Sequence, residues 1–379
     1  MTPPLAGLRI IEIAGIGPGP FCGMMLADHG AEVIRIGRPD EGGGLSVTAM
    51  DPLLRSRRLI SLDLKKPEAV LVVRRLVQSC DGLIEGFRPG VMERLGLGPE
   101  TLLGDNPKLV YGRMTGWGQT GPMAQDPGHD INYIALSGAL HAFGPTGGKP
   151  VPPINMVGDF GGGGMMLAFG MLAAILQAQA TGRGQVVDCA MTEGSAVLMS
   201  MIWGFRAMGR WGNARGTNLL DSGAHFYDTY ETADGKWVSI GSIEPQFYAV
   251  LRKVMALDGV EWDPQFAPAV WPSLTAELAQ RFKRGTRDEW VAAFAGHEAC
   301  FAPVLDFDEA TAHPHNLARG TFVEAGGVVQ PAPAPRYSMS STVPPEMAGE
   351  AETDAILAEN GFSEEEIAAL HEAGAMGKA

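Results

Sequence analysis

Apolar runs and amphipathic segments alternate over roughly the first 120 residues, and this alternation restricts the fold more than any other feature of the sequence. Leu8–Ala14 and Ala31–Ile36 are Ile- and Val-containing runs of strand length, and Phe21–His29 between them is typical of a helix that ends at Gly30. A strand, a helix and a second strand form a βαβ unit, which usually belongs to a parallel sheet covered by helices. The chain is therefore predicted to be an α/β protein.

Further segments extend this pattern. Leu59–Asp63, Asp81–Gly86 and Leu109–Met114 are predicted strands, and Pro67–Cys80 is a predicted amphipathic helix. A dense apolar helix is expected at Met165–Leu176, which is too short to cross a bilayer and fits a buried core helix.

The pattern changes after residue 225. Tyr227–Ser239 predicts a β-hairpin around the Asp234-Gly235 turn, and three helical segments follow it, which indicates a smaller α+β domain. We expect residues 1–200 and 330–379 to form a large domain, 201–224 a linker, and 225–329 the small domain. The helical segments are Gln246–Leu257, Ser273–Arg284 and Arg287–Ala295, with a tail pair at Thr353–Leu357 and Ser363–His371.

Composition excludes several classes of protein. With 379 residues and 45 % hydrophobic content the chain can bury a core, so it is not disordered. Four cysteines without a CxxC pair argue against a disulfide scaffold and a metal or redox centre, and a net charge of −14 argues against nucleic acid as a partner. The N-terminus has no basic region and no apolar signal core, so a cytoplasmic protein without a membrane partner is expected.

Positive charge gathers between Arg35 and Arg94, where eleven basic residues accompany eight acidic ones. A basic island on an acidic chain favours an anionic ligand such as a phosphate. Charge alone does not require one, because ordinary surface ion pairs explain such an island better.

The turn Gly15–Pro20 resembles a dinucleotide-binding fingerprint, but it lacks two of that motif's parts. Pro20 stands where the third glycine of G-x-G-x-x-G is needed. The second predicted strand ends in Gly37-Arg38, which leaves no acidic residue for a ribose. We therefore exclude a nicotinamide cofactor, and a glycine-rich turn near a phosphate or an adenine remains open.

Two segments carry candidate acid–base chemistry. His129 and Asp130 stand at the start of an apolar helix, where unpaired backbone N–H groups can hold a developing oxyanion. Asp159 precedes the glycines 161–164 and the apolar helix. It is either an acid–base carboxylate or a helix N-cap. The four glycines allow either the close approach of a ligand or close packing between helices. The sequence alone leaves open whether the two segments meet.

Seven segments, in order, closely resemble the alpha-methylacyl-CoA racemases, which belong to the family III CoA-transferase superfamily. The resemblance covers nearly the whole chain, and the blocks GHDINY (128–133) and IEPQFY (243–248) indicate the racemase branch rather than the transferases. The other segments are Leu8–Pro20, Phe87–Leu95, Gly158–Gly162, Thr181–Asp188 and Pro303–Leu305.

The resemblance implies a Rossmann-like large domain that binds CoA, a smaller α+β domain, and two chains interlocked into a homodimer with the site at their interface. It implies interconversion of (R)- and (S)-2-methylacyl-CoA thioesters through an enolate, with CoA as part of the substrate and no separate cofactor or metal. The alternative within the superfamily is a CoA-transferase that uses Asp159 as its nucleophile.

The resemblance also implies roles for individual residues. His129 and Asp159 would be the proton-transfer groups, Glu244 from the other chain would support His129, and the Asp130 amide would bind the thioester oxygen. Gly128 and Tyr133 would line the thioester end. Positions around the CoA nucleotide would be Arg38, Leu62, Asp63, Leu64, Lys65, Arg88 and Arg94.

The chemistry of a racemase explains why such residues are needed. Oriented donors must stabilise the enolate, a base and an acid must flank the carbon, and partial burial would raise the pKa of Asp159 so that it donates efficiently. One position departs from the family pattern: His225 stands where relatives carry a proline. The sequence leaves open whether His225 faces the site or solvent.

Overall fold

The computed structural model describes residues 1–39 and 50–376, and the chain divides into two compact units. The first contains Met1–Ser137, Ile154–Leu198 and Gly320–Ala379, and the second contains Gly138–Pro153 and Met199–Arg319. This division assigns residues 138–153 to the second unit, whereas the expectation from the sequence assigned them to the large domain.

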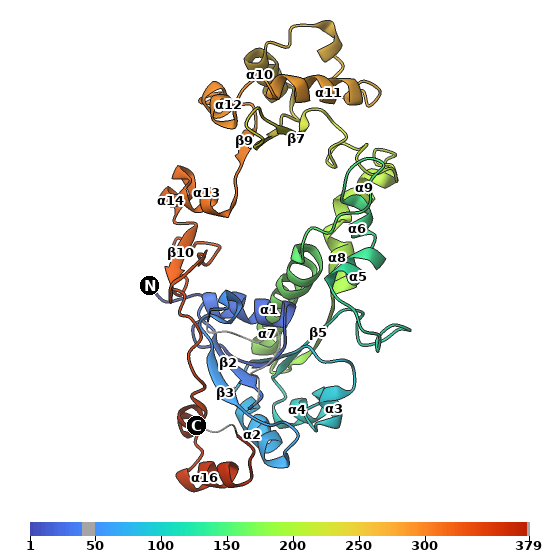
Figure 1. Cartoon of the computed structure of the whole chain (residues 1–379). Helices are drawn as coiled ribbons and strands as arrows, with labels where there is room; N and C mark the ends of the chain where they lie inside the picture. Colours follow the sequence, from blue (N-terminus) through green and yellow to red (C-terminus); the bar gives the residue numbers. More distant parts are fainter. Residues whose placement is uncertain (40–49, 377–379) are drawn as a thin grey trace. The chain divides into compact units, whose positions relative to one another are not determined.

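A six-stranded parallel sheet organises the first unit (Figure 1). The strands follow the order β3-β2-β1-β4-β5-β6, which is the order of doubly wound dinucleotide-binding folds and confirms the Rossmann-like α/β class. The strand order reverses between β1 and β4, because β2 and β3 lie on one side of β1 and β4 to β6 lie on the other. Ligands of such sheets bind at this point, outside the carboxyl ends of the strands. The strands are β1 (Arg9–Ile13), β2 (Glu32–Gly37), β3 (Arg58–Ser61), β4 (Gly82–Glu85), β5 (Val110–Thr115) and β6 (Gln185–Ala190).

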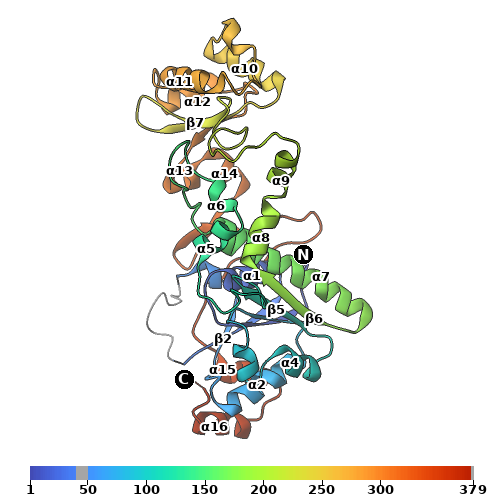
Figure 2. The ribbon, with the colours of Figure 1, turned by 90° about the vertical axis from the view of Figure 1, so that its right-hand side faces the viewer.

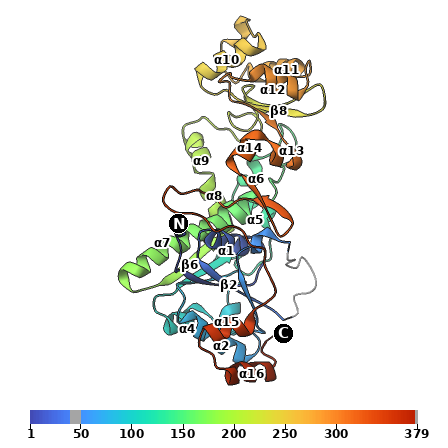
Figure 3. The ribbon, with the colours of Figure 1, turned by 90° about the vertical axis from the view of Figure 1, so that its left-hand side faces the viewer.

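Two hydrophobic cores lie on the two faces of this sheet. On one face, α1 (Pro18–Asp28) and α7 (Met166–Thr181) cover Ile10, Val33 and Val110. The other face packs against several shorter helices, and Figure 3 shows the C-terminal pair beside α2. These helices are α2 (Pro67–Val77), α3 (Val91–Arg94), α4 (Pro99–Asp105), α15 (Thr353–Glu359) and α16 (Glu364–Glu372).

The glycine-rich segment before α7 is a π-helix, η2 (Met156–Met165), that continues directly into α7. Its glycines allow close packing: a β-carbon built at Gly162 would lie 2.6 Å from the Ser195 nitrogen, and one at Gly164 would lie 2.6 Å from the Pro18 oxygen. These contacts support the helix-packing explanation of the four glycines. Ser195 belongs to α8 (Met191–Leu198).

The continuous helix of residues 156–181 is longer than the expected Met165–Leu176, because the glycine segment is itself helical. Within the described part of the chain, it is the one helix long and apolar enough to cross a bilayer by length and composition. The structure buries 44 % of its most apolar stretch, and helices in protein cores meet the same criterion.

The second unit is built on an antiparallel sheet in the order β7-β8-β9, and Figure 2 shows α11 and α12 packed with it. The predicted hairpin is confirmed as β7 and β8, and the three predicted helices are confirmed with shifts of a few residues at their ends. The elements are β7 (Tyr227–Glu231), β8 (Trp237–Gly241), β9 (Phe301–Val304), α10 (Pro245–Met255), α11 (Trp271–Phe282), α12 (Arg287–Phe294), α13 (Phe307–Ala312) and α14 (Pro314–Arg319), with α6 (Ala139–Ala142), α9 (Ser200–Ala207) and the 3-10 turn η3 (Val260–Trp262).

His225 lies in the core of this second unit with no exposed surface, which excludes the solvent-facing alternative. Its Nε2 lies 2.8 Å from the Tyr248 hydroxyl, which itself donates a hydrogen bond to the Trp262 carbonyl at 3.0 Å. Burial lowers the pKa of His225 to about 4, so the ring is neutral near pH 7.

Several boundaries differ from the sequence prediction. Strand β6 and the hairpin β10–β11 were not predicted, and α1 begins at Pro18, inside the predicted turn. Pro331 is the last residue of β11. The remaining elements are α5 (Asp130–Leu136), the 3-10 turn η1 (Pro52–Leu54), β10 (Phe322–Ala325) and β11 (Val328–Pro331).

Candidate active site

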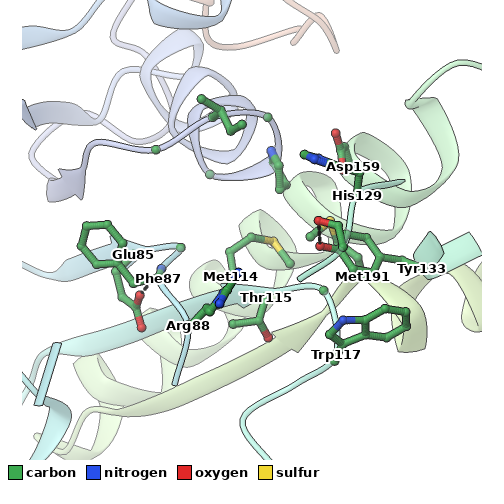
Figure 4. Close-up of a pocket in the computed structure, with 18 of the residues that line it drawn as sticks. Glu85, Phe87, Arg88, Met114, Thr115, Trp117, His129, Tyr133, Asp159 and Met191 are labelled. Atoms are coloured by element: carbon green, nitrogen blue, oxygen red, sulfur yellow. Dashed lines mark hydrogen bonds between the residues drawn. The ribbon is translucent and has the colours of Figure 1, made fainter. Parts of the chain in front are cut away.

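A pocket of about 880 Å³ opens in the first unit at the carboxyl ends of β1, β4 and β5 (Figure 4). This is the point where the strand order reverses, so the fold itself explains the pocket's position. The lining comes from the segments after these strands and from α5 and η2, and it includes Gly15–Pro20, Glu85–Pro89, Thr115–Trp117, Asp126–His129, Asn132, Tyr133, Asn155, Asp159, Phe160 and Met191.

His129 is the residue that immediately precedes α5, as the sequence predicts. Its backbone N–H donates to the Asn132 side-chain oxygen at 3.0 Å, and its carbonyl accepts the Asn132 amide at 2.8 Å. These bonds fix the His129 backbone at the helix start. The first amides of a helix have no acceptor within the helix, and Asp130 supplies the first amide of α5.

The Asp130 side chain links α5 to η2. Its Oδ1 accepts a hydrogen bond from the Asp159 backbone N–H at 2.8 Å, and the side chain is buried. A β-carbon at Gly158 would lie 2.3 Å from the same oxygen, so this contact needs glycine there. The family resemblance implies a role only for the Asp130 amide, and nothing in the sequence indicates a contact between residues 29 positions apart.

Asp159 and His129 therefore line one pocket from two different elements (Figure 4). The Asp159 Oδ2 accepts a hydrogen bond from Asn155 Nδ2 at 3.1 Å. Burial raises the pKa of Asp159 above its usual value, and the Asp130 charge raises it further, whereas Asn155 and His129 lower it. The net direction is the one expected for a carboxyl group that must donate a proton.

Tyr133 and two glycines shape the wall beside His129. The Tyr133 hydroxyl donates to the Gly128 carbonyl, and its ring meets Trp117 edge to face at 4.8 Å. β-carbons built at Gly116 and Gly128 would lie 2.0 Å and 2.6 Å from the Tyr133 ring. The ring therefore requires glycine at both positions, and it holds the peptide that leads into His129.

Arg88 also lines the pocket, from the loop after β4. Glu85, at the end of β4, holds this loop by accepting the Phe87 N–H at 2.7 Å, and Arg113 donates to Glu85 at 3.0 Å. Burial raises the pKa of Glu85 to about 7, although Phe87 and Arg113 stabilise its charged form. Glu85 is not among the residues predicted from the sequence, where its one signal is an acidic residue at the end of an apolar strand.

The remaining residues expected around the nucleotide lie outside the pocket lining. These are Arg38, Leu62, Asp63, Leu64, Lys65 and Arg94. Leu62 is fully buried, and the Asp63 N–H donates to the Ala375 carbonyl at 2.9 Å, so this segment presents its backbone to the C-terminal tail. Glu244 lies in the second unit, at the position before α10.

Part of the basic island has a structural explanation. Arg35 and Arg57 both pair with Glu12, and Arg55 pairs with Asp28, all in buried positions. These three guanidinium groups are therefore neither solvated surface charges nor part of the pocket lining.

Comparisons with known proteins agree with the fold and with the family resemblance. The family model for CoA-transferase family III matches residues 5–351. Alpha-methylacyl-CoA racemase of Mus musculus is 48 % identical over 372 residues, and that of Homo sapiens is 44 % identical over 372 residues; each alignment covers 97 % of this chain and 96 % of the relative. The crystal structure of a CAIB/BAIF family protein from Brucella suis has a TM-score of 0.81 at 26 % identity and covers 95 % of this chain and 100 % of that one. The resemblance found in the sequence is confirmed: the chain belongs to CoA-transferase family III.

Proposed function

We propose that this protein is a racemase that interconverts the (R)- and (S)-epimers of 2-methylacyl-CoA thioesters. Support comes from the two racemases that are 44 % and 48 % identical over nearly the full chain. The observation that carries the mechanism is the meeting of His129 and Asp159 in one pocket, joined by the Asp130 side chain.

The reaction breaks the C–H bond next to the thioester carbonyl and forms it again from the other side. A neutral His129 takes the α-proton, the electron pair moves onto the carbonyl oxygen, and the enolate oxygen is held by the Asp130 amide. Protonated Asp159 then delivers a proton to the opposite face, and the reverse direction exchanges the two roles. The raised pKa of Asp159 favours this use, because more of the acid form is present near neutral pH.

The anionic nucleotide of CoA would meet Arg88 at the pocket and Arg38, Arg94 and the segment 62–65 beyond it. Arginine suits phosphate because its planar fork binds two oxygens at once. A homodimer is part of the proposal, with Glu244 of the second chain placed beside His129. Sedimentation of an active monomer would contradict this part.

Exchange of the α-proton with deuterated water tests the proposal. Wild-type enzyme should exchange from either epimer, whereas His129→Ala and Asp159→Ala should each slow exchange from the epimer whose proton that residue removes, on the order of 10²- to 10⁴-fold. His371→Ala is the matched control, because His371 lies on α16 and pairs with Asp354 outside the pocket. Full exchange in both pocket variants would remove the assigned roles.

A CoA-transferase is the second candidate, favoured by the description of the family model. In that reaction the Asp159 carboxylate attacks the thioester carbon, CoA leaves as thiolate, and an acyl–aspartyl anhydride forms. Hydroxylamine would trap this anhydride as a modified Asp159 during turnover. A racemase gives exchange without such trapping, so the two candidates are separated by one pair of assays.

A further inference from the structure

A buried ionic cluster lies behind the glycine-rich turn of the pocket. The Glu12 carboxylate, on β1, has no exposed surface and accepts hydrogen bonds from Arg35 on β2 and from the Nε of Arg57 at 3.1 Å. Both guanidinium groups are also buried. Gly23 leaves the room for this cluster, since a β-carbon there would lie 2.3 Å from Glu12 Oε2 and 2.7 Å from Arg57.

The other donors of the two arginines reach both ends of the Gly15–Pro20 turn, whose last three residues also begin α1. Arg35 donates to the Gly15 carbonyl at 3.0 Å, and Arg57 donates to the Pro20 carbonyl. Each guanidinium therefore binds Glu12 and one end of Gly15–Pro20 at the same time. The whole turn lines the pocket.

The Gly15–Pro20 turn also lies against Asp159. Gly17 has φ 68°, and a β-carbon built on it would lie 3.2 Å from Asp159 Oδ2. Just beyond the turn, Phe21 stacks on Phe160 with ring centroids 4.8 Å apart. The position of the turn thus limits where the Asp159 carboxyl group can lie.

We propose that Glu12, Arg35 and Arg57 are positioning residues that hold the Gly15–Pro20 turn against Asp159 and so place its carboxyl group for proton transfer on one face of the substrate. This inference rests on the proposed racemase function. None of the three residues is part of the pocket lining, so they act through the turn. One carboxylate between two arginines makes Glu12 the shared element of the cluster.

Glu12→Gln is the decisive variant, because glutamine has the same shape but only one acceptor oxygen. Its amide NH₂ then faces an arginine donor, so one of the two hydrogen bonds is lost. The epimer whose exchange is lost in Asp159→Ala identifies the proton that Asp159 removes. For that epimer Glu12→Gln should slow exchange roughly 10- to 100-fold, with KM within about threefold of wild type. Exchange from the other epimer, which depends on His129, should change much less.

Asp28→Asn is the matched control. It breaks the Arg55–Asp28 pair, which is equally buried in the same unit and holds Gln330 and Pro331 rather than the turn. A general loss of stability would affect both variants and both epimers. Equal effects on the two epimers in Glu12→Gln, or the same epimer bias in Asp28→Asn, would overturn the inference.

Arg35→Lys covers the case in which Glu12→Gln does not fold. Lysine keeps a cation opposite Glu12, but its single nitrogen lacks the fork that reaches both Glu12 and Gly15. Exchange should again slow more for the epimer that depends on Asp159, but by a smaller factor than in Glu12→Gln. A ratio of the two exchange rates equal to that of the wild type would contradict the inference. Absence of exchange in the wild-type enzyme would instead contradict the proposed function.

Discussion

The buried carboxylate of Asp130 accepts the Asp159 N–H, so one side chain joins the helix that carries His129 to the helix that carries Asp159. Its negative charge also raises the pKa of Asp159. The two effects separate by substitution, because asparagine keeps the acceptor oxygen and loses the charge, whereas alanine loses both.

Asp130→Asn should therefore move the ionisation of Asp159 to lower pH. The Asp130 charge opposes ionisation of Asp159, so its removal favours the carboxylate, and the limb of the pH–rate profile that reports Asp159 shifts toward acid. The measurement is α-proton exchange as a function of pH. Asp130→Ala should add a large loss of kcat, and an unchanged limb in Asp130→Asn would show that the charge has no influence.

Tyr133 and Gly128 form a second pair at the residue scale. Tyr133→Phe removes the hydroxyl that binds the Gly128 carbonyl and leaves that carbonyl without this donor. We expect about 1–3 kcal/mol less stability and a fall in kcat, since the His129 peptide loses its restraint. Denaturant unfolding and steady-state kinetics measure the two effects, and an unaltered kcat would contradict the restraint.

At the scale of elements, the contact between η2 and α8 determines whether Asp159 reaches the pocket. A β-carbon at Gly194 would lie 1.8 Å from the Gly162 carbonyl oxygen, a backbone atom. The backbones of α8 and η2 are therefore in direct contact at this point. Local pattern in the sequence predicts the apolar helix well, since its composition alone requires burial. The π-helical start depends on α1 and α8, so it could not be predicted from residues 156–165 alone.

Gly194→Ala should force α8 and η2 apart, cost roughly 1–3 kcal/mol or more, and abolish most exchange activity. Gly104→Ala is the control in the same unit, because Gly104 is helical in α4 and a β-carbon there meets nothing within 4 Å. That substitution should be neutral or stabilise by about 0.5–1 kcal/mol. Thermal unfolding of the two variants gives the comparison, and similar melting temperatures would contradict the close-contact explanation.

For the whole molecule, one buried group of the second unit makes the stability of that unit depend on pH. Between about pH 6.5, its ordinary pKa, and about pH 4, His225 is neutral in the folded second unit and takes up a proton on unfolding. The unfolded state then binds more protons, so the stability of this unit decreases as pH falls from about 6.5 toward 4. The slope approaches about 1.4 kcal/mol per pH unit.

His225→Gln should remove this slope, because glutamine can keep a donor toward Tyr248 and does not titrate. Tryptophan fluorescence in denaturant is a suitable measurement, since Trp117 is in the first unit and the other tryptophans are in the second, where Trp262 lies 5.8 Å from the His225 ring. Wild-type and variant proteins should diverge between pH 6.5 and 4. A wild-type slope that persists in the variant would assign the acid sensitivity to another group.

The sequence by itself determined the α/β class, the strands β1 to β5, the hairpin of the second unit, and the start of α5 directly after His129. These features depend on neighbouring residues: the spacing of apolar side chains, turn residues and helix-start residues act within a few positions. The family resemblance added His129 and Asp159 as a pair.

Tertiary structure decided the rest. The Asp130–Asp159 link, the Glu12 cluster behind the turn, the Glu85 contact with the Phe87 loop and the burial of His225 all join residues that are brought together only by folding. Hydrogen bonds and the burial of charge depend on which strands lie adjacent, and strand order is a property of the folded sheet rather than of any one segment.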